Sequence, residues 1–425
     1  MRKFTILLCI LGILIAGCQR NQGSGNEIRF SWWGNEARNN ATIEAIRLYE
    51  SLNPGVRIIP EFAAVDGYVT RMQAQIAAGN APDIFTVSPE DLPTYVDLGA
   101  CADLTGLVDL STHNPEVARA SAINNSLYGV NLSLNANVII YNKTLAEELG
   151  IVMPEWDYTW DELISLLAEV HRRTNGQTYG MVDIRMVRPL ETYIPAWNMT
   201  YRDREPPFPW TDTQMIMTGE DVAAYMEFWS NVPYGVLLSP DETATLPSQI
   251  NAPIGTRKTF LEWNYSGTFA MIQSQTTDEL DMIPYPNNRR GRGEAVSARP
   301  GLVQVVFSGS RNKELAVDFL QWLSSDPEAG KILRTVRGVL PSSVQVEALL
   351  AEPDVLSAED QKVFTITNRI FAGTVNPFNP GLPGIANIWN ENHLIAVGAE
   401  VAFGRTTPQQ AGQRFDTFLA DALSR

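Results

Sequence analysis

The chain has 425 residues, of which 44% are hydrophobic and 19% charged, and its formal net charge is −16 at pH 7. This composition is typical of a globular protein, and the length exceeds one ordinary hydrophobic core, so two domains are expected. The acidic balance disfavours nucleic acid or anionic lipid as the main partner, so we expect no nucleic-acid function.

The N-terminal residues have the three-part layout of a secretory signal peptide. Two basic residues precede an apolar run over 4–16 that is too short for an ordinary transmembrane helix, and small residues then lead to Cys18. This end resembles a bacterial lipobox, which implies cleavage before Cys18 and an extracytoplasmic protein anchored to a bacterial membrane by lipid on that residue. A plain signal peptide or an uncleaved anchor is the alternative. We assign 1–17 to the signal peptide and 18–26 to the lipidated cysteine and a flexible tether.

The next part of the chain alternates between predicted strands and helices. In chain order these elements cover 28–32, 39–53, 56–62, 68–78 and 83–87. Such a series predicts a mainly parallel sheet covered by helices, and therefore an α/β fold. Farther on, a capping box at 159–162 predicts the start of a helix, and an apolar stripe over 316–323 predicts an amphipathic one.

No catalytic or metal-binding motif is recognisable. Cys101 is the one cysteine left besides the signal and the lipobox, so no internal disulfide is expected, and its small neighbours predict a buried side chain. The three histidines are far apart, and the chain has no Gly-rich phosphate loop and no dinucleotide fingerprint. We therefore expect no catalytic residue, no metal and no cofactor.

Several short motifs resemble those of extracellular solute-binding proteins of the maltose-binding class, the capture subunits of ABC importers. Gly-Asn-Ala-Pro-Asp-Ile-Phe at 79–85 is similar to the G-x-x-P-D-[IV]-[FI] segment of that family. Other segments that resemble family motifs follow in the expected order at 127–130, 140–143, 159–163, 312–328 and 404–411. On these motifs together, behind the lipobox, the chain is identified as a member of the family.

The resemblance implies a two-lobed, periplasmic-binding-protein-like (type II) α/β fold with three inter-lobe crossings. One lobe would hold 27–130 plus 303–337, and the other would hold 131–302 plus 338–425. The ligand would lie between the lobes, and hinge closure would enclose it, stabilised by contacts to both lobes.

Candidate ligand-binding residues follow the predicted strands of the first lobe, where open α/β sheets place their ligand crevice. Alternation along a strand turns Trp32 and Trp33 to opposite sides, and we favour Trp33 for the site. Glu36 follows the same strand, and a solvated acid near a helix start is an equal explanation for it. Ser88 and Glu90 follow the third strand, and Glu90 occupies the position where sugar-binding relatives carry an acid.

Candidates in the second lobe are amides and aromatic rings. Asn135 and Asn137 project to one side of an extended segment, where a buried structural amide is the equal alternative. Trp389 matches by position the stacking aromatic of sugar-binding relatives, and Trp197 and Trp263 are weaker candidates. The alternative is that most of the ten tryptophans belong to the core.

These observations predict a monomeric substrate-binding lipoprotein that captures a carbohydrate, an oligosaccharide, and delivers it to an ABC permease without catalysis. One departure leaves the solute open: Thr268 stands where the family often has tryptophan, and Trp263 or Tyr265 would take over the stacking. A peptide or polyamine is an alternative solute, because Glu36 and Glu90 could pair with an ammonium. A secreted glycoside hydrolase with two carboxylates is a less favoured alternative, and a role in sensing is not distinguished from transport.

Overall fold

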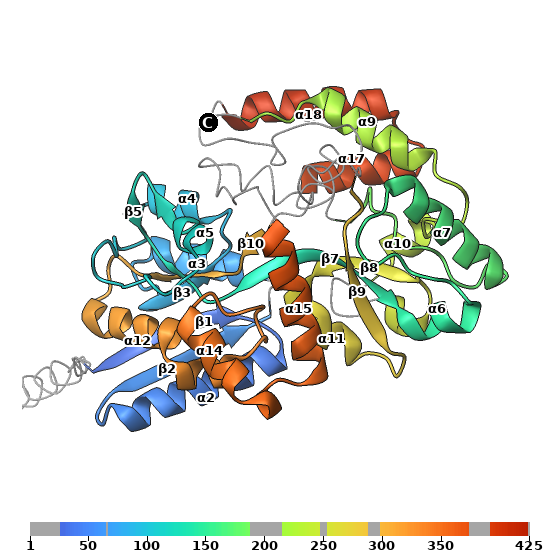
Figure 1. Ribbon diagram of the computed structural model, residues 1–425. Coiled ribbons are helices and arrows are strands. Elements are labelled where there is room, and N and C mark those ends of the chain that lie inside the picture. The colour runs from blue at the N-terminus through green and yellow to red at the C-terminus, as the bar shows by residue number, and fades with distance from the viewer. Residues whose placement is uncertain are drawn as a thin grey trace, which may run out of the picture.

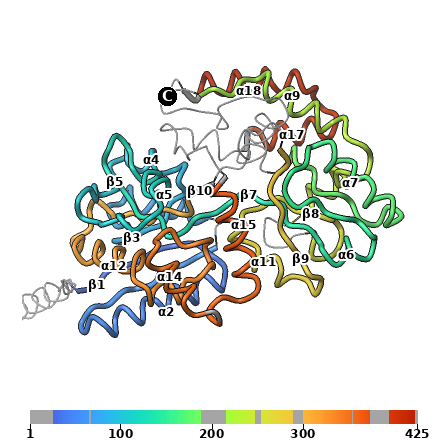
Figure 2. Tube along the Cα trace, in the orientation of Figure 1, coloured from blue at the N-terminus to red at the C-terminus, as the bar shows by residue number. Residues whose placement is uncertain are grey.

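The computed structural model describes residues 26–64, 67–187, 215–246, 253–287, 298–373 and 392–423. Figure 1 shows that these stretches form two lobes, with strand β7 (Leu134–Asn142) and helix α15 (Ala358–Gly373) between them. The trace in Figure 2 shows that the first lobe combines blue and orange segments, which come from the beginning and the later part of the chain. The lobes are therefore assembled from segments that are far apart in the sequence.

The first lobe is built on one sheet whose central strands are apolar and buried. Its strands lie in the order β2 (Arg57–Ala63), β1 (Glu27–Trp33), β3 (Ile84–Val87), β11 (Val303–Val306) and β6 (Val130–Asn131). Strand β1 runs parallel to β2 and β3, as the alternation of strands and helices predicts, whereas β11 is antiparallel to both of its neighbours. The carboxyl ends of β1 and β3 therefore lie at the same edge of this sheet.

Helices cover both faces of this sheet. Ile28, Phe30 and Trp32 of β1 share one apolar cluster with residues of α2 (Glu36–Leu52) and α12 (Lys313–Ser325). On the other face, a second cluster joins β3 and β11 to α3 (Tyr68–Ala77) and α4 (Leu92–Asp97). The remaining elements of the lobe are α5 (Pro115–Arg119), β4 (Ala122–Ile123), β5 (Ser126–Leu127), α13 (Pro327–Leu333), α14 (Ser343–Ala351) and the 3₁₀ turn η4 (Pro353–Val355).

The second lobe is built on an antiparallel sheet centred on β7. Strand β8 (Leu261–Tyr265) pairs with residues 137–141 of β7. Strand β10 (Ala298–Pro300) pairs with residues 134–136 of β7, and β9 (Leu280–Pro284) pairs with residues 138–142. The expectation of a mainly parallel sheet thus describes β1, β2 and β3 but not this lobe. The physical reason is that β8 and β9, which α11 joins, do not pair with each other: β7 lies between them and runs opposite to both, so every neighbouring pair is antiparallel.

The helices of the second lobe surround a large apolar core. Helix α7 (Trp160–Arg173) begins with the predicted capping box, in which Thr159 and Glu162 bond each other's backbone reciprocally. Helices α9 (Gly219–Ser230) and α18 (Pro408–Leu423) pack side by side at the top of Figure 1. The other elements are α6 (Lys143–Leu149), α10 (Pro240–Ala244), η2 (Pro253–Thr256), η3 (Ser266–Thr268), α11 (Phe269–Gln273) and α17 (Asn392–Ala402). In the part of the chain that is described, no helix has both the length and the apolarity needed to cross a bilayer.

Three segments meet where the chain passes between the lobes. The amide of Gly301 donates to the carbonyl of Ser133 at 2.6 Å, so the passage from β6 to β7 lies beside the return from β10 to β11. Leu134 and Val339 exchange two backbone hydrogen bonds, of 2.6 and 2.9 Å. These bonds tie the segments to one another at the hinge.

The last boundary between the lobes differs from the one expected at 338. The apolar core of the first lobe includes Leu340, Leu349 and Leu356, and the core of the second lobe includes Val363, Ile366 and Ile370. After pairing with β7, the chain therefore turns back into the first lobe, and it enters the second with α15. Helix α14 packs on α13, which keeps this segment with the first lobe.

Candidate functional site

Trp33 ends strand β1 and is held by an aromatic neighbour. It is half-buried, and its ring centroid lies 4.8 Å from that of Tyr68 of α3. The Tyr68 hydroxyl donates to the carbonyl of Ser31 and accepts from the amide of Thr86, each at 3.1 Å, so it bridges β1 and β3. Burial raises the pKa of Tyr68 to about 12, so the hydroxyl stays protonated and able to donate at neutral pH. Trp33 thus packs against a fixed side chain and is itself partly exposed.

Trp32 and Glu36, which lie close to Trp33 in the chain, differ from it in burial. Trp32 is buried in the first lobe's core, and its indole nitrogen donates to Asn39 Oδ1 at 2.8 Å. This confirms the prediction that Trp32 and Trp33 face opposite sides. Glu36 is exposed and is the first residue of α2, which Asn35 caps by accepting from the amide of Arg38. An acid in the first turn of a helix interacts favourably with the helix dipole, which suits the alternative explanation for Glu36.

Glu90 follows β3 and is linked to the other lobe. Its carboxylate is buried and lies 2.5 Å from Nη2 of Arg299, a residue of β10 in the second sheet. Arg299 also donates to the Tyr265 hydroxyl, and its guanidinium lies 4.9 Å from the Tyr265 ring centroid. Ser88 is partly exposed, and its carbonyl accepts from the amides of Asp91 and Leu92 at the start of α4. The loop after β3 therefore brings a carboxylate to a guanidinium and a phenol of the second lobe.

Asn135 and Asn137 of β7 lie close to this group. Asn135 donates to the carbonyl of Arg337 at 2.8 Å and accepts from the amide of Gly267 at 3.0 Å. The nitrogen and the oxygen of the Asn135 side-chain amide are therefore both hydrogen-bonded to backbone groups, which suits the alternative of a structural role for this residue. Asn137 is buried and stands opposite Tyr265 in the pairing of β7 with β8.

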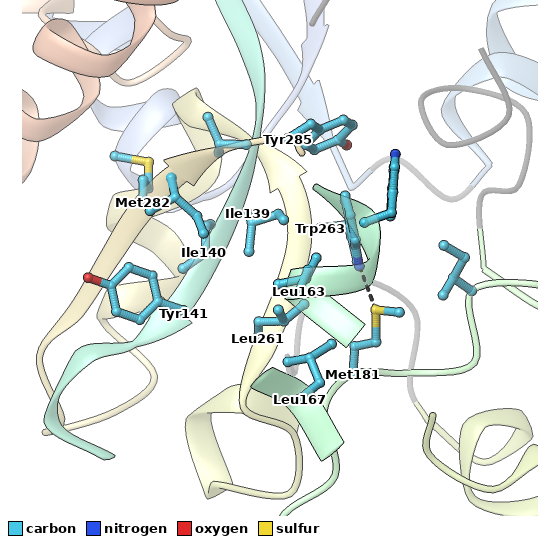
Figure 3. Packing of buried hydrophobic residues seen from close by; sticks show 14 of the residues in the cluster. Ile139, Ile140, Tyr141, Leu163, Leu167, Met181, Leu261, Trp263, Met282 and Tyr285 are labelled. Carbon is cyan, nitrogen blue, oxygen red and sulfur yellow. Dashed lines mark hydrogen bonds between the residues drawn. The ribbon is translucent and has the colours of Figure 1, made fainter. Parts of the chain in front are cut away.

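Trp263 lies inside the core of the second lobe. It is only 4% exposed, and its ring stacks on Trp160 with centroids 5.3 Å apart and planes at 17°. Figure 3 shows its indole nitrogen directed at Met181, whose sulfur accepts at 2.8 Å, with Tyr285 also against it. These neighbours leave no ring face for a solute, so its placement is that of a core residue. Of the two aromatics considered as replacements at Thr268, Tyr265 is the partly exposed one.

Three residues predicted from the sequence cannot be placed. Trp197, Trp389 and Cys18 lie outside the described residues. Arg299 was not predicted from the sequence, because a lone arginine after a segment rich in Arg and Gly has the pattern of a solvated loop. The local signal that could have indicated a structural position for Arg299 is the apolar segment at 302–306, which begins three residues later and predicts a strand.

The titratable groups of the described residues do not form a metal centre. Nowhere in those stretches do three or more His, Cys, Asp or Glu side chains group in a way that could hold a metal ion. Cys101 is buried, as predicted, and desolvation raises its pKa to about 12, which keeps it protonated and unreactive at neutral pH.

Comparison with known proteins decides the family. Residues 44–365 match the family described as bacterial extracellular solute-binding protein. The chain belongs to this family. Its members bind solutes outside the cytoplasm, so the protein is an extracytoplasmic solute-binding protein and not an enzyme.

Individual relatives are similar at lower identity. The multiple sugar-binding protein of Streptococcus mutans is 27% identical over 39% of this chain and 40% of its own length. The arabinooligosaccharide-binding protein of Bacillus subtilis is 22% identical over 80% of this chain and 79% of its own length. A periplasmic oligogalacturonide binding protein from Yersinia enterocolitica, solved in complex with saturated digalacturonic acid, matches with a TM-score of 0.78. It is 19% identical, and the match covers 93% of this chain and 99% of that one, which confirms the two-lobed α/β fold.

Proposed function

We propose that this solute-binding protein captures a carbohydrate, an oligosaccharide, between its lobes and delivers it as a monomer to an ABC permease. The names of the relatives support a sugar as the solute. The observation that carries the proposal is the partly exposed residue Trp33 at the same sheet edge as the Glu90–Arg299 pair. An aromatic face that covers C–H groups, beside planar charged groups that bind hydroxyls, is the combination that sugar recognition requires.

The capture step needs binding energy and no bond chemistry. In this proposal Trp33 and Ser88 contact the solute from the first lobe, and Trp197 and Trp389 contact it from the second. Glu90 and Asn137, which are 2% and 3% exposed, position the groups around it. Glu36 is solvent-facing and would contact only the rim of the solute. The backbone contacts of Asn135 and the burial of Trp263 favour supporting roles for these two residues. A solute that touches both lobes stabilises the closed arrangement by the free energy of those contacts.

A binding screen tests this function. The mature protein is mixed with neutral mono- and oligosaccharides, peptides and polyamines, and its melting temperature is recorded. A ligand at 100 times its dissociation constant adds about 2.7 kcal/mol of stability, which is readily measured. We expect an oligosaccharide to give the largest shift, and chromatography of the mixture to recover it intact. A shift given by a peptide or polyamine alone would replace the sugar in this proposal, and release of shorter sugars would contradict it.

We also propose that Cys18 carries the lipid that anchors the protein to the membrane. Support comes from the order of basic, apolar and small residues before this cysteine. Mass spectrometry of the N-terminal peptide of the membrane-extracted protein should find acyl chains on Cys18. The Cys18→Ala variant should leave the membrane fraction, whereas Cys101→Ala, a change of the buried cysteine, should not.

A further inference from the structure

Two arginines link helix α2 to the segment at 336–337 beside the hinge. Arg38 lies in the first turn of α2, and its guanidinium donates to the carbonyls of Trp33 at 3.3 Å and Val336 at 3.5 Å. Arg337 lies in the segment that pairs with β7, and its Nη2 donates to Thr42 Oγ1 of α2 at 2.6 Å. Each side chain thus extends from its own segment to the other one.

Neither guanidinium has an acidic partner. In the described stretches no carboxylate oxygen lies within 4.0 Å of either arginine, and Arg337 Nη1 is buried without a hydrogen-bond partner. Arg337 as a whole is 7% exposed. Burial lowers the pKa of both guanidiniums, and the charge of Arg38 lowers that of Arg337 further. Since arginine stays protonated at neutral pH, two positive charges are held together in a desolvated place.

Such an arrangement is unfavourable unless something compensates it. An uncompensated buried charge is strongly destabilising, and buried charges in proteins are therefore paired or bound to ions. The carbonyl and hydroxyl contacts of these arginines supply dipoles and no counter-charge. The 17-residue helix α2 directs the positive end of its dipole to the turn that contains Arg38, which adds to the positive potential. The two guanidiniums without acidic partners and the helix dipole all favour the binding of an anion.

We infer that Arg38 and Arg337 bind an anion, either a small inorganic ion or a carboxylate group of the solute. Both sources present the same chemistry, a negative charge that accepts hydrogen bonds from guanidinium forks. The anion would supply the missing partner of Arg337 Nη1. It would also join α2 to the segment bonded to Leu134 of β7, and so strengthen the first lobe's side of the hinge. Binding of an inorganic ion does not depend on which solute the protein carries, whereas binding of a solute carboxylate rests on the proposed function and requires an acidic solute.

The first test uses inorganic anions and matched variants. The melting temperature of the mature wild-type protein is followed as chloride, bromide or sulfate is added at low ionic strength. We expect a saturable rise, with half-saturation shifted at least tenfold upward in Arg337→Gln. Arg311→Gln removes the same charge from an exposed position and should behave as wild type. Equal responses of all three proteins would indicate general salt effects and count against the site.

A second measurement needs no variant and distinguishes the sources. Wild-type crystals grown in bromide should show an anomalous peak in contact with both guanidiniums. If digalacturonate removes that peak and a neutral disaccharide does not, then the solute supplies the negative charge. If the peak persists both with digalacturonate and with the neutral disaccharide, then the inorganic ion is resident. The inference is overturned if no peak is found and Arg337→Gln binds digalacturonate and inorganic anions as the wild type does.

Discussion

At the scale of single residues, a side chain can serve a ligand only where its neighbours leave part of it uncovered. Trp33 and Trp263 both lie on strands, and both rings contact other aromatic rings. Trp33 is partly exposed beside Tyr68, whereas Trp263 is 4% exposed between Trp160 and Tyr285. The two tryptophans therefore differ in burial, and substitution can test whether they also differ in role.

Trp33→Ala should weaken binding of the oligosaccharide found by the screen at least tenfold, because the stacking face is lost. The free energy of unfolding of the unliganded protein should change by no more than about 1–2 kcal/mol, since part of the ring is already in water. Calorimetric titration and urea unfolding measure the two effects. The matched variant Trp263→Ala should lose about 3–5 kcal/mol of stability, as buried aromatics do. A severe stability loss in Trp33→Ala with normal binding would assign Trp33 to the core.

The opposite orientation of Trp32 and Trp33 could be predicted from the sequence, because it follows from the alternation of a strand. The burial of Trp263 could not, because Trp160 comes from a helix more than one hundred residues away in the chain. Arg299 was missed for the same reason: Tyr265 is brought to it by strand pairing within the second lobe, and Glu90 by the approach of the first lobe. Local patterns show what a residue can do, and long-range packing determines what covers it.

His113 should make the stability of the protein pH-dependent. It is 5% exposed, and desolvation lowers its pKa to about 4, against smaller opposite effects of Asp109 and the Ser324 carbonyl. Between the unfolded value, about 6.5, and this lowered value, the unfolded chain binds the proton and the folded one does not. Stability is therefore lost as the pH falls through this window, by roughly 3 kcal/mol at most. Urea unfolding at pH 7 and pH 4 should show a smaller loss in His113→Gln than in wild type, and equal losses would exclude this residue as the cause.

At the scale of elements, the local signals and the long-range pairings differ in how far they could be predicted. The Thr159 capping box and the apolar stripe of α12 are encoded within a few residues, and the structure has both. The antiparallel pairing of β7 with β8 and the return of α14 to the first lobe depend on contacts between distant segments. No short motif encodes these contacts. The sequence therefore predicted the α/β fold class, but it did not predict that the chain returns to the first lobe with α14 before α15 enters the second.

The segment that pairs with β7 requires glycine at one position. Gly338 has φ +116°, and a Cβ there would lie 2.3 Å from the carbonyl oxygen of Leu134. Gly338→Ala should therefore lower the free energy of unfolding by roughly 2 kcal/mol or more, through backbone strain and displacement of the Leu134–Val339 bonds. Gly404→Ala is the control, because Gly404 has φ +68° and open space around it, and about 1 kcal/mol is expected. Urea unfolding compares the two, and equal losses would mean that the contact with β7 adds nothing.

At the scale of the whole molecule, the two lobes are joined by backbone at the crossings and by the Glu90–Arg299 ion pair. The side chains of Glu90 and Arg299 are 3% and 14% exposed; Glu90 follows strand β3 of the first lobe's sheet, and Arg299 lies in β10 of the second lobe's sheet. A buried pair of this kind contributes little relative to an apolar pair, but removing one partner is costly, because the remaining charge has lost its counter-charge. The pair therefore makes the relative position of the lobes depend on both residues together.

Arg299→Gln should lower the free energy of unfolding by about 3 kcal/mol, because Glu90 loses its cationic partner. The double variant Glu90→Gln/Arg299→Gln should recover part of this loss, since no buried charge of the pair remains, and the double-mutant cycle should give a coupling of about 1–3 kcal/mol. If the pair also holds the lobes, small-angle scattering should show a larger radius of gyration for unliganded Arg299→Gln than for wild type. Arg405→Gln, a change at an exposed arginine of the second lobe, is the control and should alter neither quantity. Additive single losses with an unchanged radius of gyration would show that the two residues act separately and that the backbone crossings alone set the arrangement of the lobes.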